Sequence, residues 1–171
     1  MRARPRPRSS AGDAVEAGVR GGAQPGLWVV EGTVVALDLD RFEEEVERRG
    51  WSRWSPNEAT GLLSSLVEGL ARRWRGVVVY GLDWDRGTEE AILEFPLVKP
   101  GELARDLEEI RETVKREAGV TLTIAAVWGP VTGRPASTRR EAYYGTPTRR
   151  MAWRALRAAK RRGGDRLVII E

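Results

Sequence analysis

Two aspartates in the run ALDLDRF have the spacing of a metal site. Asp38 and Asp40 are two residues apart, so on a strand their side chains project from the same face. Two carboxylates on one face suit a hard cation such as Mg²⁺. Asp83 and Asp85, in the segment GLDWDRG, would add acids from a hairpin turn. The competing interpretation is structural, because Asp40, with Glu43 three residues later, has the pattern of a helix cap.

A second chemical feature is a basic segment with aromatic rings among its arginines. Residues 132–164 contain ten Arg or Lys residues and one acid, although the whole chain has a net charge of only +4. Arginines can follow a phosphate backbone, and aromatic rings stack on bases of any sequence. The segment therefore favours single-stranded nucleic acid as a ligand, and the alternative is a solvated helix whose arginines pair with acids. The candidate residues are Arg134, Arg139, Arg140, Tyr143, Tyr144, Arg149, Arg150, Trp153, Arg154 and Arg157.

Two further candidates are tryptophans in the segment WSRWSP. Trp51 and Trp54 flank Arg53 just before a predicted helix. Helix N-termini attract phosphates and exposed indoles stack on bases, so both residues join the candidate nucleic-acid-binding set. The alternative for Trp54 is a hydrophobic staple against the start of the helix.

The composition excludes several kinds of chemistry. The chain has neither Cys nor His, which rules out thiolate catalysis, disulfides, imidazole bases and almost every zinc site. Any metal must therefore bind to oxygen. The single Asn and single Gln, beside abundant Arg and Glu, indicate a hyperthermophile, although a GC-rich genome would also enrich Arg.

The length of 171 residues suits one domain with a proper core. Residues 1–26 are rich in Pro, Gly and Arg, and we expect a disordered basic arm that either touches phosphates or has no role. Residues 27–171 are expected to form a single α+β nucleic-acid-binding domain. No apolar run reaches the roughly 18 residues of a membrane span and no secretory signal is present, so a cytoplasmic location is expected.

Hydrophobic periodicity predicts the order β-α-α-β-β-α-β-loop-α-β. The strands are expected at 33–39, 76–83, 88–96, 120–128 and 165–171, and the last helix begins at Pro147 after Thr146 as N-cap. Ser55 is expected to cap the second helix, with Pro56 in its first turn. The predicted class is α+β: a mixed, mainly antiparallel sheet of about four to five strands with helices packed on one face. This arrangement is ferredoxin-like or palm-like, with an added C-terminal helix and strand.

Two family resemblances follow from these motifs. The segments WSPNEAT, YGLDWDRGTEEA and TGRPASTRREAYYGTPTRR resemble the ThermoDBP group of archaeal single-stranded DNA-binding proteins. That resemblance implies sequence-tolerant binding of single strands, self-association and no catalysis, although this chain lacks the C-terminal leucine zipper of some members. The run ALDLDRF resembles the LDxDxF segment of GGDEF and related palm-type nucleotide enzymes, where such acids hold the metal, but the GGDEF residues themselves are missing.

The sequence thus leads to one main hypothesis and two alternatives. The main one is a non-enzymatic protein from a hyperthermophilic archaeon that binds single-stranded DNA, or RNA, as a homo-oligomer and needs no cofactor. The first alternative is an Mg²⁺-dependent nucleotide cyclase, cyclohydrolase or palm-type enzyme that uses Asp38 and Asp40. Archaeal metal-dependent GTP cyclohydrolases look similar at this strand and hairpin. The second alternative is a structural protein that only self-assembles.

Overall fold

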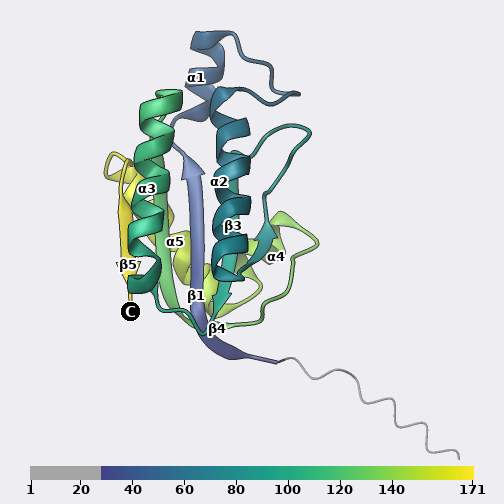
Figure 1. Cartoon of the computed structure of the whole chain (residues 1–171), viewed down its shortest axis with the longest axis vertical. Coiled ribbons are helices and arrows are strands. Elements are labelled where there is room, and N and C mark those ends of the chain that lie inside the picture. The colour runs from purple at the N-terminus through teal and green to yellow at the C-terminus, as the bar shows by residue number, and fades with distance from the viewer. Residues whose placement is uncertain (1–27) are drawn as a thin grey trace, which may run out of the picture.

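The computed structural model describes residues 28–171, so the arm expected at 1–26 lies outside the described residues. Residues 28–171 form five helices and five strands, and Figure 1 shows how they are arranged. In chain order the elements are β1 (Val30–Leu39), α1 (Phe42–Arg49), α2 (Glu58–Trp74), β2 (Val77–Tyr80), β3 (Glu90–Pro96), α3 (Pro100–Ala118), β4 (Leu122–Val131), α4 (Arg139–Tyr144), α5 (Pro147–Arg161) and β5 (Leu167–Ile170).

The strands form one five-stranded sheet in the order β2-β3-β1-β4-β5. β1 is the central strand and runs antiparallel to β3 and β4, whereas β5 is parallel to β4. Residues 34–37 of β1 are fully buried, which agrees with an apolar run covered on both faces. The predicted α+β class with a mainly antiparallel sheet is therefore confirmed.

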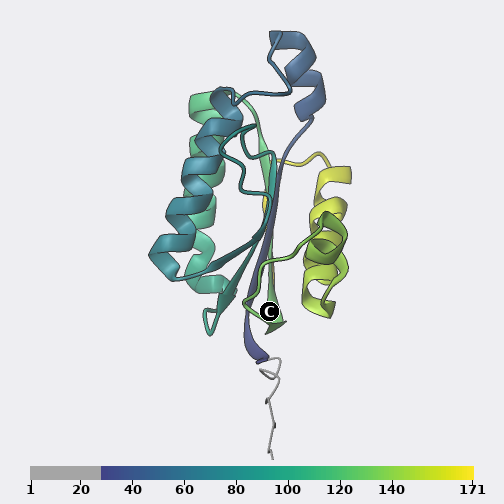
Figure 2. The same cartoon turned by 90° about the vertical axis from the view of Figure 1, so that its right-hand side faces the viewer.

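Helices cover both faces of the sheet rather than the one face expected. α2 and α3 pack on one face, and α4 and α5 pack on the other (Figure 2). Alternate residues of β1 serve the two layers: Val35 and Leu37 belong to the core under α2 and α3, while Val34 and Ala36 belong to the core under α5. α1 lies beyond the end of the sheet at the top of Figure 1.

Local capping chemistry explains where three of the helices begin. Asn57, and not the expected Ser55, caps α2: its side chain accepts hydrogen bonds from the backbone N–H groups of Ala59 and Thr60, and the Thr60 hydroxyl accepts one from the backbone N–H of Asn57. Thr146 caps α5 as expected, with Pro147 in the first turn. Residues 139–144, which we expected as loop, form the short helix α4 because Thr138 caps it.

A buried ion pair fastens the α5 layer to the sheet. Glu94 of β3 is completely buried, and its Oε1 lies 2.7 Å from Nε of Arg149, whose side chain is only 3% exposed. The other carboxylate oxygen of Glu94 accepts hydrogen bonds from the backbone of Thr132 and Gly133. Arg149 also donates to the carbonyl of Arg134, so one pair ties β3, the loop after β4 and α5 together.

We expect Arg149→Met to lower the free energy of unfolding by about 3 to 5 kcal/mol, because it leaves the Glu94 carboxylate buried without its counter-ion. The exposed neighbour provides the control, since Arg150→Met should change stability by less than about 0.5 kcal/mol. Denaturant unfolding followed by circular dichroism measures both. Equal stability of the two variants would contradict the structural role given to the pair.

Candidate functional site

The C-terminal end of β1 carries a half-buried ion pair. Asp38 lies one residue before the end of the strand, and its Oδ1 is 2.8 Å from Nζ of Lys160 in the last turn of α5. Nζ of Lys160 also donates a 2.8 Å hydrogen bond to the carbonyl of Leu39. Asp38 therefore faces the α5 layer, and a cation already lies against it.

Asp40 has a structural role instead of the predicted metal-binding one. Its carboxylate accepts hydrogen bonds from the hydroxyls of Thr121 (2.9 Å) and Thr123 (2.7 Å) and from the backbone N–H of Asp165 (2.8 Å). Its side chain is only 8% exposed. These donors leave little of the carboxylate for a metal, and Asp40 does not cap α1 either, because the N-cap residue is Arg41, which makes no side-chain cap.

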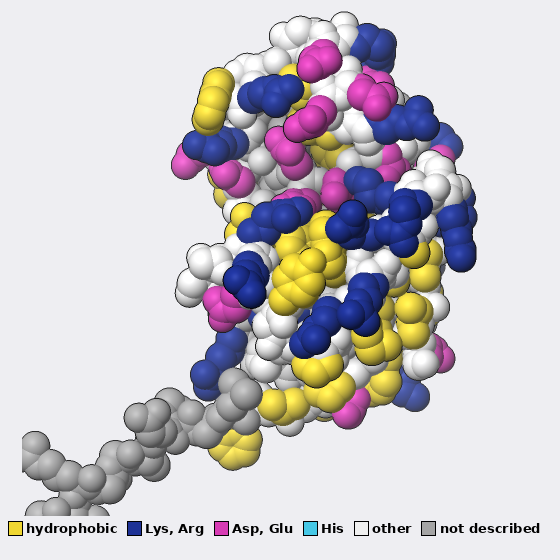
Figure 3. Space-filling model, turned by 180° about the vertical axis from the view of Figure 1, so that it is seen from behind, with side chains coloured by type: hydrophobic (Ala, Val, Ile, Leu, Met, Phe, Trp, Pro, Cys, Tyr) yellow, Lys and Arg dark blue, Asp and Glu magenta, His cyan; other side chains and the backbone are white. Residues whose placement is uncertain are grey.

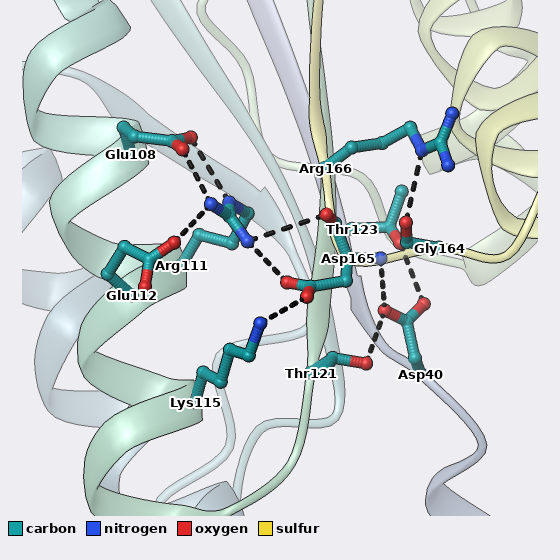
Figure 4. A network of polar contacts seen from close by, with 10 residues as sticks. All are labelled: Asp40, Glu108, Arg111, Glu112, Lys115, Thr121, Thr123, Gly164, Asp165 and Arg166. Carbon is teal, nitrogen blue, oxygen red and sulfur yellow. Dashed lines mark hydrogen bonds and ion pairs between the residues drawn. The ribbon is translucent and has the colours of Figure 1, made fainter.

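The turn between α5 and β5 comes close to Asp40 (Figure 4). A Cβ atom at Gly164 would lie 2.7 Å from the Asp40 carboxylate, and Gly164 has a positive φ of 68°, so both space and backbone demand glycine. Asp165 then turns toward α3, where its carboxylate pairs with Arg111 and with Lys115 at 2.6 Å. Burial alone would raise the pKa of Asp165, but hydrogen bonds from Lys115 and Arg111 outweigh it, and the pKa is lowered.

A second acid lies next to Asp38. The register of β1 and β3 pairs Asp38 with Glu90, so their side chains share the face that α4 and α5 cover. Glu90 is held by Arg139 of α4, whose Nε and second guanidinium nitrogen lie 2.5 and 2.9 Å from its oxygens, and it accepts a hydrogen bond from the hydroxyl of Tyr143. Each acid of the pair thus has its own cation from the α4–α5 layer.

Negative charge is concentrated at this end of the sheet. Burial raises the pKa of Asp38, and the carboxylates of Glu90 and Asp40 add to the rise against the opposing effect of Lys160. Partial burial also raises the pKa of Glu89, and the negative charges of Asp38 and Glu90 raise it further. The carboxylates of Asp38, Glu89 and Glu90 therefore repel one another, and a shared cation would relieve this repulsion.

A cavity of about 640 Å³ adjoins the acids. Its wall includes Glu89 and Glu90, the β2–β3 connection and, as cations, Arg53 and Arg86. The connection spans 81–89, longer than the tight turn expected, and Asp83 stabilises it by accepting hydrogen bonds from the backbone of Asp85 and Arg86. The cavity has room for a ligand of nucleotide size. The structure thus brings Asp83 to the cavity wall, whereas Asp85 is not among the residues that line it.

The aromatic candidates divide between the surface and the interior. Trp54 is 73% exposed, and the guanidinium of Arg86 lies 5.0 Å from its ring. Trp51 is half-buried against the core, where it contacts Phe42 and lies under Arg49. Trp54 therefore remains available for stacking beside the cavity, and the staple interpretation is not needed to explain its position.

The basic segment also separates into buried and exposed residues. Arg149 is committed to Glu94, and Tyr143 is 1% exposed and bonded to Glu90, so neither can reach a nucleic-acid strand as predicted. Trp153 is half-buried and packs 4.1 Å from the ring of Tyr143. On this face of the molecule Figure 3 shows Lys and Arg side chains around hydrophobic ones. The remaining candidates are exposed: Arg134, Arg139, Arg140, Tyr144, Arg150, Arg154 and Arg157.

Three residues of the site were missed in the sequence. Glu89 and Glu90 form an acidic pair in the segment TEEA, at the start of the strand after the hairpin connection. This position could have marked them as candidate site residues. Lys160 is the one lysine of α5, and nothing local distinguishes it from the arginines around it. Its importance comes from the tertiary contact with Asp38, 122 positions earlier in the numbering.

Within residues 28–171, no group of three or more acids is arranged to hold a metal ion by itself. Mg²⁺ does not require such a cage, because it commonly takes one or two carboxylates and completes its shell with water and substrate phosphates. The pair Asp38 and Glu90 fits that mode. The same part of the chain contains no helix that is long and apolar enough to cross a membrane.

Comparison with known proteins identifies the fold. No family model and no curated protein matches the chain. The GGDEF domain of DgcB from Caulobacter crescentus, solved with c-di-GMP, matches with a TM-score of 0.56 at 19% identity over 81% of this chain and 77% of that one. The diguanylate cyclase SiaD from Pseudomonas aeruginosa matches with a TM-score of 0.51 at 21% identity, over 81% of this chain and 50% of SiaD. A bacterial light-regulated adenylyl cyclase matches with a TM-score of 0.56 at 13% identity, over 83% of this chain and 43% of that one.

These neighbours correct one prediction and leave another open. The expected class, a DNA-binding protein without catalytic activity, is contradicted, because the solved structures that share the fold are GGDEF and cyclase domains. At these identities the likeness establishes the palm-like fold, and any activity must be argued from the site. The resemblance to the ThermoDBP group stays a prediction that none of these findings tests.

The raised pKa of Asp38 has a consequence for stability. A carboxyl whose pKa is higher in the folded protein than its ordinary 3.8 stabilises the fold while protonated, and this contribution is lost as the pH rises through the folded value. We therefore expect Asp38→Asn to be more stable than the wild type at neutral pH. The difference should shrink to nothing as the pH falls below 3.8. Thermal unfolding of both proteins across this range measures it, and a variant less stable at neutral pH would contradict the expectation.

Proposed function

We propose that the protein is a metal-dependent nucleotide enzyme that binds a nucleoside triphosphate with Mg²⁺ at the end of β1 and acts on its phosphates. The observation that carries the proposal is the juxtaposition of Asp38 and Glu90 beside a cavity of about 640 Å³. The palm-like fold, which diguanylate and adenylyl cyclase domains also have, supports the same class of chemistry. This is the alternative of the sequence analysis, with Glu90 in place of Asp40.

Asp38 and Glu90 would hold the metal ion. They come from adjacent strands and share one face, and the metal ion would take the place that the cations of Lys160 and Arg139 have against them. Bound Mg²⁺ supplies charge neutralisation on the phosphate oxygens and makes the phosphorus easier to attack. Asp40 takes no part, since its side chain is only 8% exposed and is held by Thr121, Thr123 and the backbone of Asp165. Glu90 is 20% exposed and would exchange its contacts with Arg139 and Tyr143 for the metal.

The cavity supplies groups of the kind that a triphosphate needs. Arg53 and Arg86 enter its wall from two different loops, and guanidinium groups bind phosphate oxygens in pairs. Glu89 lies at the same wall, and its raised pKa moves it toward the range in which a carboxylate accepts a proton in catalysis. In cyclisation or nucleotidyl transfer, a hydroxyl would lose its proton to Glu89, bond to the α-phosphorus and release pyrophosphate.

Trp54 would provide the platform for the base. Its ring is 73% exposed, and the guanidinium of Arg86 lies over it at 5.0 Å. Stacking on an indole tolerates any base, so this contact would add affinity without choosing between adenine and guanine. The role is the one that the sequence suggested for Trp54, transferred from a nucleic-acid strand to a nucleotide.

We expect the purified protein to convert ATP or GTP to pyrophosphate and a nucleotide product when Mg²⁺ is present. Asp38→Asn and Glu90→Gln should each lower the rate by about 100-fold or more, because each removes a ligand of the metal ion that neutralises the reacting phosphates. Asp85→Asn, on the exposed hairpin, is the matched control and should keep the wild-type rate. Ion-exchange chromatography of the products measures turnover, and an inert wild-type protein would refute the proposal.

We also expect Trp54→Ala to weaken binding of a nucleoside triphosphate by about 10-fold, because one stacking contact is worth roughly 1 to 3 kcal/mol. Trp84→Ala is the control, since Trp84 is 52% exposed on the β2–β3 connection and does not line the cavity. Isothermal titration calorimetry with the nucleotide and with inorganic tripolyphosphate separates base from phosphate binding. Loss of tripolyphosphate affinity in Trp54→Ala would show that the ring does not act as a base platform.

A further inference from the structure

The ammonium group of Lys160 lies among oxygens in the way that a bound cation does. Its Nζ is 2.8 Å from Oδ1 of Asp38, 2.8 Å from the carbonyl oxygen of Leu39 and 3.7 Å from Oδ1 of Asp40. These oxygens come from three consecutive residues at the end of β1. Carboxylate and carbonyl oxygens are also the ligands that hard divalent cations take.

The ammonium and a metal ion cannot use these oxygens together. A metal ion bound to Asp38 would lie about 2.0 to 2.6 Å from the carboxylate oxygen, within the space that Nζ now occupies. Two cations at such a short separation repel strongly, above all in a half-buried site. The side chains of Asp38 and Lys160 are only 24% and 26% exposed, so water screens this repulsion incompletely.

Lys160 is also able to leave. Its side chain is partly exposed, it belongs to the last turn of its helix, and a lysine side chain swings on a flexible four-carbon stem. Asp40 does not depend on the ammonium, because Thr121, Thr123 and Asp165 already donate to it. Moving Lys160 therefore uncovers Asp38 and the Leu39 carbonyl without disturbing the network around Asp40.

We propose that Lys160 is the resident cation of this site in the metal-free protein, and that the ammonium and a divalent metal ion occupy it alternately. The inference rests on the proposed function only in taking Asp38 as a metal ligand. Lys160 keeps the metal-free protein folded by neutralising Asp38, and it lowers metal affinity because the metal must first displace it.

The test is the binding of Mn²⁺, used alone as the probe, to the full-length chain without nucleotide. We expect Lys160→Met to bind one Mn²⁺ about 10-fold more tightly than the wild type, by titration calorimetry or by electron paramagnetic resonance of free Mn²⁺. Arg157→Met removes the same charge one turn earlier, from the exposed side of α5, and should leave the affinity unchanged. The double variant Asp38→Asn/Lys160→Met should lose the tight site.

Thermal unfolding gives a second measurement, the rise in melting temperature on adding Mn²⁺. A variant that merely folds poorly would not show a larger rise than the wild type. Lys160→Met should melt below the wild type without metal, because Asp38 loses its partner, and Mn²⁺ should raise its melting temperature more than that of the wild type. Lys160→Gln, which can still donate to the Leu39 carbonyl, should behave in the same direction and replaces Lys160→Met if that variant does not fold.

The inference would be overturned if both Lys160 variants bound Mn²⁺ no more tightly than the wild type. It would also be overturned if Mn²⁺ raised the melting temperatures of the variants and the wild type equally. Because no nucleotide is present, failure of turnover in the enzyme assay does not affect this result. Conversely, active protein whose Lys160 variants bind Mn²⁺ no better would refute the inference and leave the proposed function standing.

Discussion

The carboxylate of Asp40 is the constraint on which the site depends. Two threonine hydroxyls from the start of β4 and the backbone of Asp165 donate to it, so it joins the end of β1 to β4 and to the turn after α5. Only glycine fits at position 164 against this carboxylate. Because the end of α5 is fixed in this way, Lys160 reaches Asp38. Asp40, which contacts no ligand in this account, thus sets the surroundings of Asp38, which would bind the metal.

A buried carboxylate also fixes the position of the α4–α5 layer against the acids. The buried pair of Glu94 and Arg149 anchors α5 and the loop after β4, and α4 follows directly from that loop. Arg139 and Tyr143 of α4 are thereby placed against Glu90, as Lys160 is against Asp38. The α4–α5 layer thus offsets the negative charge that would destabilise this end of the sheet. The pKa of Asp38 is still raised, so its ionised form costs stability, as is common at functional sites.

Local signals in the sequence were enough for most of the fold and for one residue of the site. The apolar run of β1, the stripe of α2 and the Thr146-Pro147 start of α5 depend on neighbours in the chain, and Asp38 was found because it follows such a run. Glu90 and Lys160 could not be assigned in the same way, since the β1–β3 register and the crossing of α5 create their contacts with Asp38. Arg149 and Tyr143 were assigned wrongly for the converse reason. Their residue types suit a nucleic-acid surface, but Arg149 pairs with the buried carboxylate of Glu94 and Tyr143 is itself buried and bonded to Glu90. The inference of a non-enzymatic DNA-binding protein depended partly on these two residues.

The central claim is that Asp38 and Glu90 together bind a metal ion that carries a nucleoside triphosphate. A crystal structure with Mn²⁺ and a non-hydrolysable nucleoside triphosphate tests it most directly, because the anomalous signal of manganese locates the ion without ambiguity. The account predicts a manganese peak in contact with both carboxylates, phosphates toward Arg53 and Arg86, and the Lys160 ammonium displaced from Asp38. A structure in which Lys160 still pairs with Asp38, while the nucleotide lies elsewhere, such as against the exposed arginines of α5, would contradict it.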